Sequence, residues 1–416
     1  MNVPKIRING FDGEWKLVPF SKVATLRRGL TYSPSNISEN GVRVLRSCNI
    51  DEDTFVTSDD DVFVKTNCVN IPLVNDGDIL ITAANGSPRL VGKHCIVKNP
   101  KAELMAHGGF MLLASSIDSN FLNASMGSSW FEDFKRIGIA GGNGAIGNLN
   151  KNELENFLFY VPTSKAERDK IATYFDNLDS LIETTGKKIA SLKQTKLACL
   201  QKMFPADGET TPRIRFKGFE GEWQLRKIGE LGTTYSGLSG KSKADFGLGS
   251  AQYITFLNVL TNAHIDTTIF ESVNIKPGEK QNKVIKGDIL FNTSSETPEE
   301  VGYCSVLMKD VENLYLNSFC FGFRPYAGTI NPEFMVYLMR SQIGRSIMKI
   351  LAQGATRYNL SKNRLCEVTI PIPANDEEQQ QIAAFFSNMD KQIRIQEQRL
   401  EKLKRIKTAC LENMFV

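Results

Sequence analysis

The segment KIATYFDNLDSLIETTGKKIASLKQTKLACLQKMF, residues Lys170–Phe204, carries a seam of mostly apolar residues at alternating spacings of four and three. The seam residues are Ile171, Phe175, Leu178, Ile182, Thr185, Ile189, Leu192, Lys196, Cys199 and Met203. This spacing, kept for more than four heptads, is typical of a coiled coil rather than of a general amphipathic helix. A lone helix of about 38 residues, about 57 Å long, would leave the seam in water. The sequence therefore predicts a long helix with a helical partner.

The partner is in the same chain, because the same spacing returns near the C-terminus. The matching residues are Ile382, Phe386, Met389, Ile393, Gln396, Leu400, Leu403, Lys407, Cys410 and Met414. The second helix can return beside the first in either sense, and we favour antiparallel pairing because the two halves then become equivalent. Two lysines match across the seams, Lys196 and Lys407. Their ammonium groups either extend to water at the end of the coil or fix the register or face a partner protein.

The duplication covers the whole chain. Short phrases recur at offsets of 208, 210 and 211 residues, which indicates two copies of one unit with small loop changes. The pairs are GFDGEW (Gly10–Trp15) with GFEGEW (Gly218–Trp223), GDILI (Gly77–Ile81) with GDILF (Gly287–Phe291), and NLNKNEL (Asn148–Leu154) with NLSKNRL (Asn359–Leu365). We expect Trp15 and Trp223 to pack structurally where a globular domain meets a helix.

Each copy begins with a Gly-, Ser- and Asn-rich part that contains short apolar runs such as DILIT and CFGFRP. These runs predict strands, with some helix around Phe121–Arg136 and Pro332–Met348. Proline followed by Ser164, or by Asn375 and Asp376, predicts the starts of the long helices. The predicted fold class is α+β, with two mixed globular domains joined by two long antiparallel coiled-coil helices in a pseudo-twofold duplication. The predicted divisions are a first domain at 1–163, a helix at 164–205, a second domain at 206–373 and a helix at 374–416.

Composition excludes several classes of protein. No run approaches eighteen apolar residues and the N-terminus lacks the apolar core of a signal peptide, so we expect a cytoplasmic protein without a membrane span. Eight cysteines without a CxxC pair indicate free thiols in a reducing compartment. Three histidines exclude zinc sites of the HExxH or Cys2His2 kind. A net charge of +4 permits nucleic-acid binding without arguing for it.

No motif in the chain supports catalysis. SGLSGKS (Ser236–Ser242) lacks the first glycine of a phosphate-binding loop, because that position is Tyr235. NPEF (Asn331–Phe334) lacks the second proline of the adenine methyltransferase motif. The acidic run NIDEDTFVTSDDD (Asn49–Asp61) lacks the ligand spacing of a calcium loop and is expected to be a solvated loop. We therefore expect no catalytic residue, no metal site and no cofactor bound by this chain.

Two variable globular parts that alternate with two near-identical long helices resemble the specificity subunit of type I restriction–modification enzymes. The resemblance includes the tryptophan-containing openings, the GDIL strands, the NLSKNRL run and the proline-bearing strands FYVPT and IPIPA. It implies that each globular part reads one half of a bipartite double-stranded DNA site. The helices would set the spacing and dock two methyltransferase (modification) subunits, with restriction–translocase subunits in the full complex. S-adenosylmethionine, ATP and Mg²⁺ would belong to those partners.

Base readout needs bidentate side chains such as Arg, Asn and Gln, whereas phosphate contacts need cations. The richest segments precede the two NL(N/S)KN runs and follow the two GDIL strands. The candidate DNA-binding residues are Arg89, Lys93, Asn143, Asn148, Lys151, Lys241, Gln353, Arg357, Tyr358 and Lys362. Lys151 and Lys362 agree between the copies and are expected to bind phosphate or to be structural. Ordinary turn composition also accounts for such loops.

Two other functions remain open at this point. A duplicated coiled coil also suits a scaffold that organises partner proteins without DNA. An enzyme with an unrecognised site would be established by methyl transfer by the purified chain alone. Steep salt dependence and sequence-specific binding to a bipartite duplex would favour the DNA-reading function.

Overall fold

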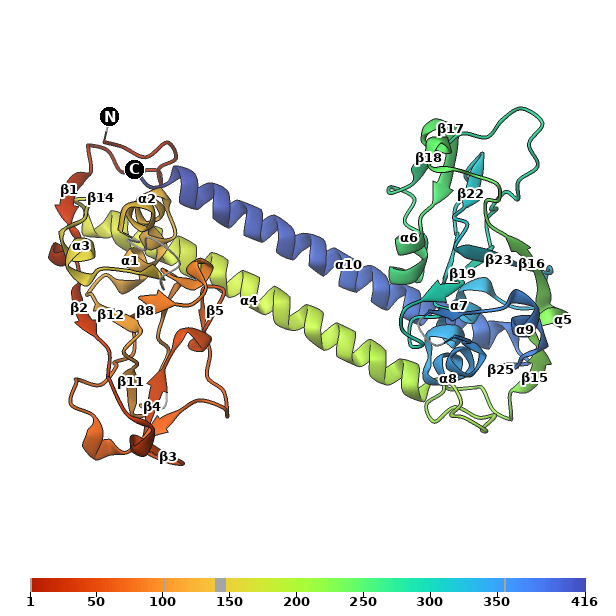
Figure 1. The fold of residues 1–416 in the computed structure, drawn as a ribbon, viewed down its shortest axis with the longest axis horizontal. Coiled ribbons are helices and arrows are strands. Elements are labelled where there is room, and N and C mark those ends of the chain that lie inside the picture. The colour runs from red at the N-terminus through yellow and green to blue at the C-terminus, as the bar shows by residue number, and fades with distance from the viewer. Residues whose placement is uncertain (1, 100–101, 139–146, 355–356) are drawn as a thin grey trace. The chain divides into compact units, whose positions relative to one another are not determined.

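The computed structural model describes residues 2–99, 102–138, 147–354 and 357–416, and it divides into two compact units. Unit 1 is residues 1–186 with 398–416, and unit 2 is residues 187–397. Each unit therefore combines one globular part with segments of both long helices, α4 (Lys165–Lys202) and α10 (Asp376–Asn413) (Figure 1). The predicted helix starts are confirmed, and side-chain oxygens cap both: Ser164 Oγ accepts from Glu167 N at 3.4 Å and Asn375 Oδ1 from Glu377 N at 2.8 Å. The four-part division by residue number stays a prediction.

Unit 1 is built on two four-stranded sheets. The first has the order β10-β8-β12-β2, and β8 at its centre is buried along its whole length. The second has the order β11-β4-β7-β3, and a two-stranded sheet joins β1 to β14. The elements are β1 (Lys16–Pro19), β2 (Thr25–Arg28), β3 (Ile37–Ser38), β4 (Val42–Leu45), β5 (Ile50–Asp51), β6 (Thr54–Phe55), β7 (Phe63–Val64), β8 (Ile79–Thr82), β9 (Ala84–Asn85), β10 (His94–Ile96), β11 (Met105–His107), β12 (Met111–Ser115), α1 (Ser119–Met126), α2 (Ser129–Gly138), β13 (Gly147–Asn148), α3 (Lys151–Asn156) and β14 (Leu158–Val161).

Unit 2 repeats this plan around a sheet of order β16-β23-β19-β21, in which β19 matches β8. A three-stranded sheet of order β18-β17-β22 and a two-stranded sheet β15-β25 complete it. The elements are β15 (Gln224–Lys227), α5 (Ile228–Leu231), β16 (Gly232–Ser236), β17 (Phe246–Ile254), α6 (Phe256–Thr261), β18 (Glu271–Val273), β19 (Ile289–Asn292), β20 (Ser294–Ser295), β21 (Cys304–Val306), β22 (Leu314–Leu316), β23 (Cys320–Pro325), α7 (Pro332–Arg340), α8 (Gln342–Leu351), β24 (Tyr358–Asn359), α9 (Lys362–Glu367) and β25 (Thr369–Ile372). The predicted GDIL and CFGFRP strands and the helices of both copies are confirmed.

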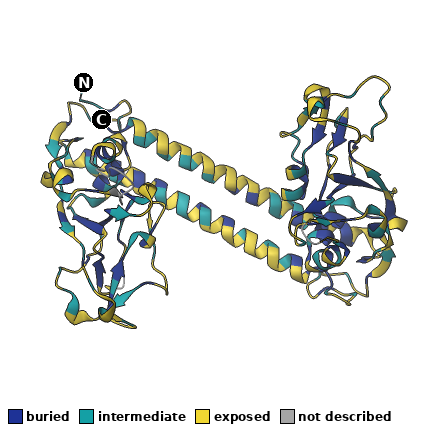
Figure 2. Cartoon of the chain, in the orientation of Figure 1, coloured by how far each residue is buried: buried dark blue, intermediate teal, exposed yellow. Residues whose placement is uncertain are grey.

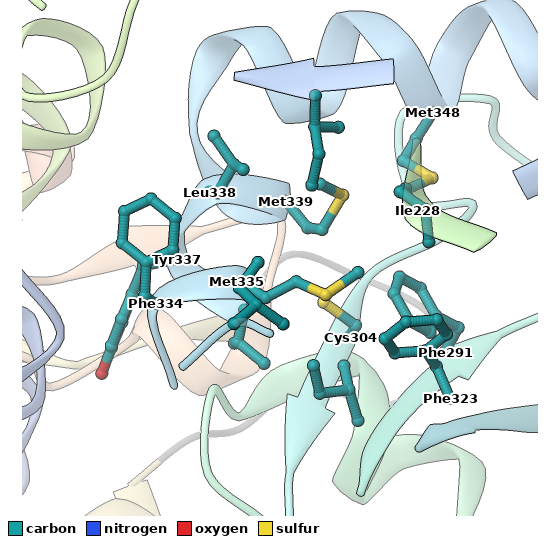
Figure 3. Packing of buried hydrophobic residues seen from close by; sticks show 14 of the residues in the cluster. Ile228, Phe291, Cys304, Phe323, Phe334, Met335, Tyr337, Leu338, Met339 and Met348 are labelled. Atoms are coloured by element: carbon teal, nitrogen blue, oxygen red, sulfur yellow. The ribbon is translucent and has the colours of Figure 1, made fainter. Parts of the chain in front are cut away.

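The core of unit 2 forms where α7 packs on the central sheet. Six consecutive residues of α7, from Phe334 to Met339, are buried. Figure 3 shows Met335 beside Cys304 and, on the strands below, Phe291 and Phe323. A helix that is apolar on every face belongs inside a domain. This burial places α7 in the core of unit 2, between β23 and α8 in the chain.

The repeated tryptophans close a matched aromatic cluster in each unit, as predicted. Trp15 is 3% exposed and its ring meets Phe415, near the C-terminus, edge to face at 6.2 Å. Trp223 is 2% exposed and meets Phe204, at the end of α4, edge to face at 6.1 Å. The end of each long helix thus packs into the domain that the other copy begins.

An arginine–glutamate pair holds the same junction in both units. Arg7 Nε lies 2.7 Å from Glu167 Oε1, and Arg215 Nε lies 2.6 Å from Glu378 Oε1. Both glutamates are buried, and each arginine also donates to a backbone oxygen of the GF(D/E)GEW turn at 2.6 Å. The bond to Glu167 raises the pKa of Arg7. Bidentate pairs of this kind are directional as well as strong, so they fix the angle at which the chain meets the helix.

The two long helices contact each other in antiparallel fashion within each unit, as predicted. In unit 1, Lys407 Nζ lies 2.8 Å from Asp179 Oδ1 across the two helices. In unit 2, Lys196 pairs with Asp390, at the equivalent positions. The lysine side chains are only 17% and 20% exposed, so they do not extend to water. These matched pairs favour the interpretation that the seam lysines fix the register. Figure 2 shows buried and exposed residues alternating along both helices.

Most of the acidic run Asn49–Asp61 is exposed, as expected for a solvated loop, but the run also contacts α10, which was not expected. Its β5–β6 turn lies on α10, where Asp53 Oδ2 is 2.7 Å from Lys407 Nζ and Glu52 is 3.1 Å from Lys404. Burial lowers the pKa of Lys407, but the charges and hydrogen bonds of Asp53 and Asp179 outweigh it and raise the pKa above its ordinary value. The sequence of the acidic run could not predict these contacts with α10, because the lysine partners are about 350 residues away.

Two buried histidines make unit 1 sensitive to acid. Burial lowers the pKa of both His94 and His107 from the ordinary 6.5 to about 4. The nearby charged groups are Asp53, Lys135 and Lys407 at His94, and Arg27 and Asp78 at His107. Since the unfolded chain takes up these protons near pH 6.5, the histidines contribute full stability above that pH and lose it as the pH falls toward 4.

We expect unit 1 to lose about 2 kcal/mol per histidine between pH 7.5 and pH 5. Guanidinium denaturation at the two pH values measures the loss. His94→Gln and His107→Gln should flatten the pH dependence even where they lower stability. An unchanged pH dependence in the double variant would contradict the assignment.

Candidate nucleic-acid interface

A two-residue ladder brings the two predicted DNA-reading loops together in each unit. In unit 1, β9 follows the GDIL strand and pairs with β13, with Asn85 opposite Gly147 and Asn148 opposite Ala84. In unit 2, β20 follows the second GDIL strand and pairs with β24, with Ser295 opposite Tyr358. The sequence predicted the loops separately, and the fold makes each pair a single surface.

In unit 1, the predicted residues occupy different positions around this ladder. Arg89 is exposed on the short turn Pro88–Leu90, Asn148 is exposed on β13, and Lys93 is half-buried before β10. Lys151 begins α3 and pairs with Glu155 at 2.9 Å. Asn143 lies outside the described residues. Arg89 and Asn148 therefore have the most accessible side chains of the described candidates here.

A cavity of about 750 Å³ lies next to the β9 strand, between the two sheets of unit 1. Its lining includes Tyr32, Arg46, Asn85 and Phe110. Asn85 Nδ2 donates to Ser47 Oγ at 3.1 Å, which orients the amide at the rim. Within the described residues, the buried Arg46 Nε has no hydrogen-bond partner. This combination of apolar wall, amide and cation suits a polyanion with aromatic bases better than an apolar ligand.

In unit 2, three candidates form one loop over the ladder. Gln353 and Asn359 exchange backbone hydrogen bonds of 3.0 and 2.8 Å, which closes a tight loop. Within it, Arg357 Nε donates to Ser294 Oγ at 2.8 Å, and Tyr358 is half-buried on β24. Lys362, half-buried at the start of α9, donates to Ser236 Oγ at 2.7 Å. Hydrogen bonds to neighbouring strands position these cations before any ligand arrives.

Lys241 has the least accessible charge of the candidates. Its side chain is 4% exposed, and its ammonium lies 2.6 Å from Glu279 and donates to Asn274 O at 2.6 Å. Bonds from Lys241 are the main reason that the pKa of Glu279 falls to about 2. The backbone of Ser239 also exchanges two hydrogen bonds with the side-chain amide of Gln281, so this loop is held in place by its neighbours.

A lysine-rich turn next to this loop was missed by the sequence reasoning. The run KPGEKQNKVIK at Lys276–Lys286 carries four lysines in eleven residues. All four lysines are exposed, and Lys283 also donates to Asn313 Oδ1 at 2.9 Å. Local lysine density was the signal that could have found it, since such runs are typical of phosphate-binding patches. The equivalent segment of the first copy, residues 66–76, contains no lysine.

The repeated aspartate of the GDIL phrase is structural. Asp78 lies 2.9 Å from Arg27 Nη2, and Asp288 lies 2.7 Å from Arg324 Nη2, each across the central sheet. Tyr235 donates to Asp288 at 2.6 Å, and burial beside this carboxylate raises the tyrosine pKa. Fully engaged groups of this kind brace a sheet rather than act on a substrate.

The described part of the chain contains no cluster of three or more potential metal ligands, and its eight cysteines are free. None of the described helices is long and apolar enough to cross a membrane.

A family model, "Type I restriction modification DNA specificity domain", matches residues 220–405. The chain is 26% identical to the EcoKI specificity subunit of Escherichia coli K12 over 308 residues, 71% of this chain and 64% of that one. It is 25% identical to the MjaVIII specificity subunit of Methanocaldococcus jannaschii over 365 residues, 83% and 79% of the two chains. Residues 220–405 therefore match a type I DNA specificity domain, and most of the chain is similar to type I restriction–modification specificity subunits.

Solved structures share the fold. The S subunit of a type I system from M. genitalium matches with a TM-score of 0.59 at 14% identity, over 100% of this chain and 99% of that one. A chain from a structural study of complex assembly in a type I system matches with a TM-score of 0.51 at 16% identity, over 95% and 96%. Two further curated relatives, from M. jannaschii and Salmonella potsdam, are matched over less than half of their own length. The chain therefore spans less than two thirds of the length of these two relatives and of the EcoKI subunit.

These matches confirm the predicted likeness to type I specificity subunits, and the solved structures confirm the α+β architecture. The individual DNA-binding residues remain predictions.

Proposed function

We propose that this chain reads a bipartite DNA site, one half-site with each globular domain. The observation that carries the proposal is the duplicated ladder, which joins the same two loops beside the central sheet in both units. To read two different half-sites, the two domains need the same backbone support with different side chains on it. Asn85 and Gly147 pair on the first ladder where Ser295 and Tyr358 pair on the second, whereas Asn148 and Asn359 are the same residue in both copies.

The side chains on the two ladders suit base readout and backbone contact in different proportions. Asn148 and Gln353 have amides that match adenine edges, and Arg89 and Arg357 have guanidinium groups that match guanine. Lys93 and Lys362, with the exposed Lys276 and Lys280, suit phosphates, which fix position without reading sequence. Lys151 and Lys241 already have intramolecular carboxylate partners, and we propose supporting roles for them.

The long helices suit a spacer of fixed length. The matched pairs Lys196–Asp390 and Lys407–Asp179 oppose sliding of one helix along the other. A fixed spacer lets two domains read half-sites separated by about one helical turn of DNA, near 34–36 Å. By the family likeness, the helices also dock two modification subunits, which supply S-adenosylmethionine. Restriction–translocase subunits, with ATP and Mg²⁺, complete the assembly in the cytoplasm.

The test is binding of the chain, purified with its modification subunits, to duplexes that carry the site mapped from methylated adenines. We expect at least about 10³-fold tighter binding to this duplex than to a scrambled one. Affinity should fall by about 10³–10⁵ between 50 and 200 mM salt if six to ten phosphates are contacted. Equal affinity for both duplexes would overturn the proposal and favour a scaffold that does not read DNA.

A further inference from the structure

Two exposed phenylalanines occupy the same place beside the ladders of the two units. Phe110 directly precedes β12 and is 70% exposed, and Phe319 directly precedes β23 and is 55% exposed. Their equivalence follows from the strand pairing, because Met111 lies opposite Thr82 as Cys320 lies opposite Asn292. The residues around them differ, GGFML against NSFCF, so the phenyl group is shared where its neighbours are not.

The backbone at each phenylalanine is held by the residue that leads into the ladder. Ala83 N donates to Phe110 O at 2.9 Å, and Ala83 O accepts from Leu149 N at 2.8 Å. In unit 2, Thr293 N donates to Phe319 O at 3.0 Å, and Thr293 O accepts from Leu360 N at 2.8 Å. The backbone at each phenylalanine is therefore held one strand away from the loops that we propose to read DNA.

Each ring has an arginine in its neighbourhood. Phe110 lines the cavity that also contains Arg46 and Asn85. The guanidinium of Arg357 lies 5.9 Å from the centroid of the Phe319 ring. An exposed ring among cations is poorly suited to an apolar protein partner, whereas aromatic side chains beside cations are the usual means of contacting bases.

We propose that Phe110 and Phe319 are a matched pair of apolar wedges, each inserted at a base step of one half-site. This inference rests on the proposed reading of DNA. Inserted phenylalanines partly unstack a step and favour sequences in which that step deforms easily. Each domain then reads its half-site in two ways: by hydrogen bonds from the residues of its ladder, and by the ease with which the DNA deforms around its phenylalanine. Both half-sites are recognised by the same combination.

Single isolated apolar residues are common on protein surfaces, so a matched control is needed. Leu17 and Leu225 provide it, because they are also equivalent in the two copies and are 49% and 59% exposed. They lie on the separate sheets β1–β14 and β15–β25. Leu17→Ala and Leu225→Ala therefore remove exposed apolar surface from the same units without touching the ladders.

The experiment uses the chain with its modification subunits and duplexes carrying 2-aminopurine at each step of the mapped site except the methylated adenines. We expect the unaltered complex to raise the fluorescence at one step in each half-site. Phe110→Ala should abolish the rise in one half-site only and Phe319→Ala in the other. Each should weaken specific binding about ten- to hundredfold and leave binding to scrambled DNA unchanged, which also reports that the variant is folded.

Unchanged specific affinity in both phenylalanine variants would overturn the proposal, as would an equal loss in the leucine controls. A loss that is the same on scrambled DNA would also overturn it. Failure of the proposed function is recognised separately, because the unaltered complex itself would then bind specific and scrambled duplexes equally.

Discussion

Phe204→Ala and Phe415→Ala are each expected to lower the free energy of unfolding of one unit by about 3–5 kcal/mol. Phe204 is 1% exposed and contacts the rings of Trp223, Phe334 and Phe386 at centroid distances of 6.1, 5.8 and 5.8 Å. Its truncation leaves a cavity walled by three large rings. Such rings cannot collapse into the space without leaving their rotamers, so most of the lost contact energy is not recovered.

Phe415 has the same role in unit 1, where it contacts Trp15, Phe121 and Phe175 at centroid distances of 6.2, 6.0 and 5.7 Å. Phe415 lies close to the C-terminus, where substitutions are usually tolerated. Here the substitution is expected to be costly, because the Phe415 side chain is only 6% exposed and packs in the core of unit 1. Thermal unfolding should show a fall of about 10 °C in the midpoint of the affected unit.

The control is the same substitution at exposed positions. Phe110→Ala in unit 1 and Phe319→Ala in unit 2 should change stability by no more than about 0.5 kcal/mol. Guanidinium denaturation followed by tryptophan fluorescence measures all four variants, because Trp15 and Trp223 lie in the affected clusters. A loss below about 1 kcal/mol at Phe204 or Phe415 would show that the helix ends are not part of the domain cores.

The sequence predicted the long helices and the repeated tryptophan phrases, but not the contacts between residues that are far apart in the chain. The repeated GF(D/E)GEW phrases and the helices were visible because they are regular or duplicated, and the tryptophans were expected at a junction. The sequence did not show that Trp15 meets Phe415, 400 residues away, since no local pattern records a partner at that separation. The seam lysines were ambiguous for the same reason, because Asp179 and Asp390 become their partners only once the helices are paired.

The candidate interface was predictable as loops but not as a surface. Two-residue strands such as β9 and β13 carry no alternation that a sequence can display. Composition also misjudged Lys241, which looks like a free cation in SGKSK and is nearly buried beside Glu279. Phe110 and Phe319 were overlooked because an isolated phenylalanine next to a strand usually points into the core.

Exchanging residues 1–163 with the equivalent segment of another specificity subunit is expected to change one half of the recognised site completely. The other half and the gap should stay the same, because the second domain and the helices are unaltered. Each mismatched base pair costs about 1–3 kcal/mol, so a few changed contacts shift preference by several orders of magnitude. Sequencing of methylated adenines in cells carrying the chimaera with its modification and restriction subunits reads both halves at once.

The contacts between the exchanged domain and the long helices limit which specificity subunits can supply that domain. The incoming domain must provide an arginine for Glu167 and a tryptophan for Phe415, since Glu167 and Phe415 stay in the recipient. Asp118, which accepts from Arg168 at 2.8 Å, is a third requirement. The reciprocal exchange of 206–373, with an arginine for Glu378 and a tryptophan for Phe204, is the matched control and should change only the other half. If either exchange altered both halves, the domains would not read independently, and the duplicated ladders would have to act as one composite surface.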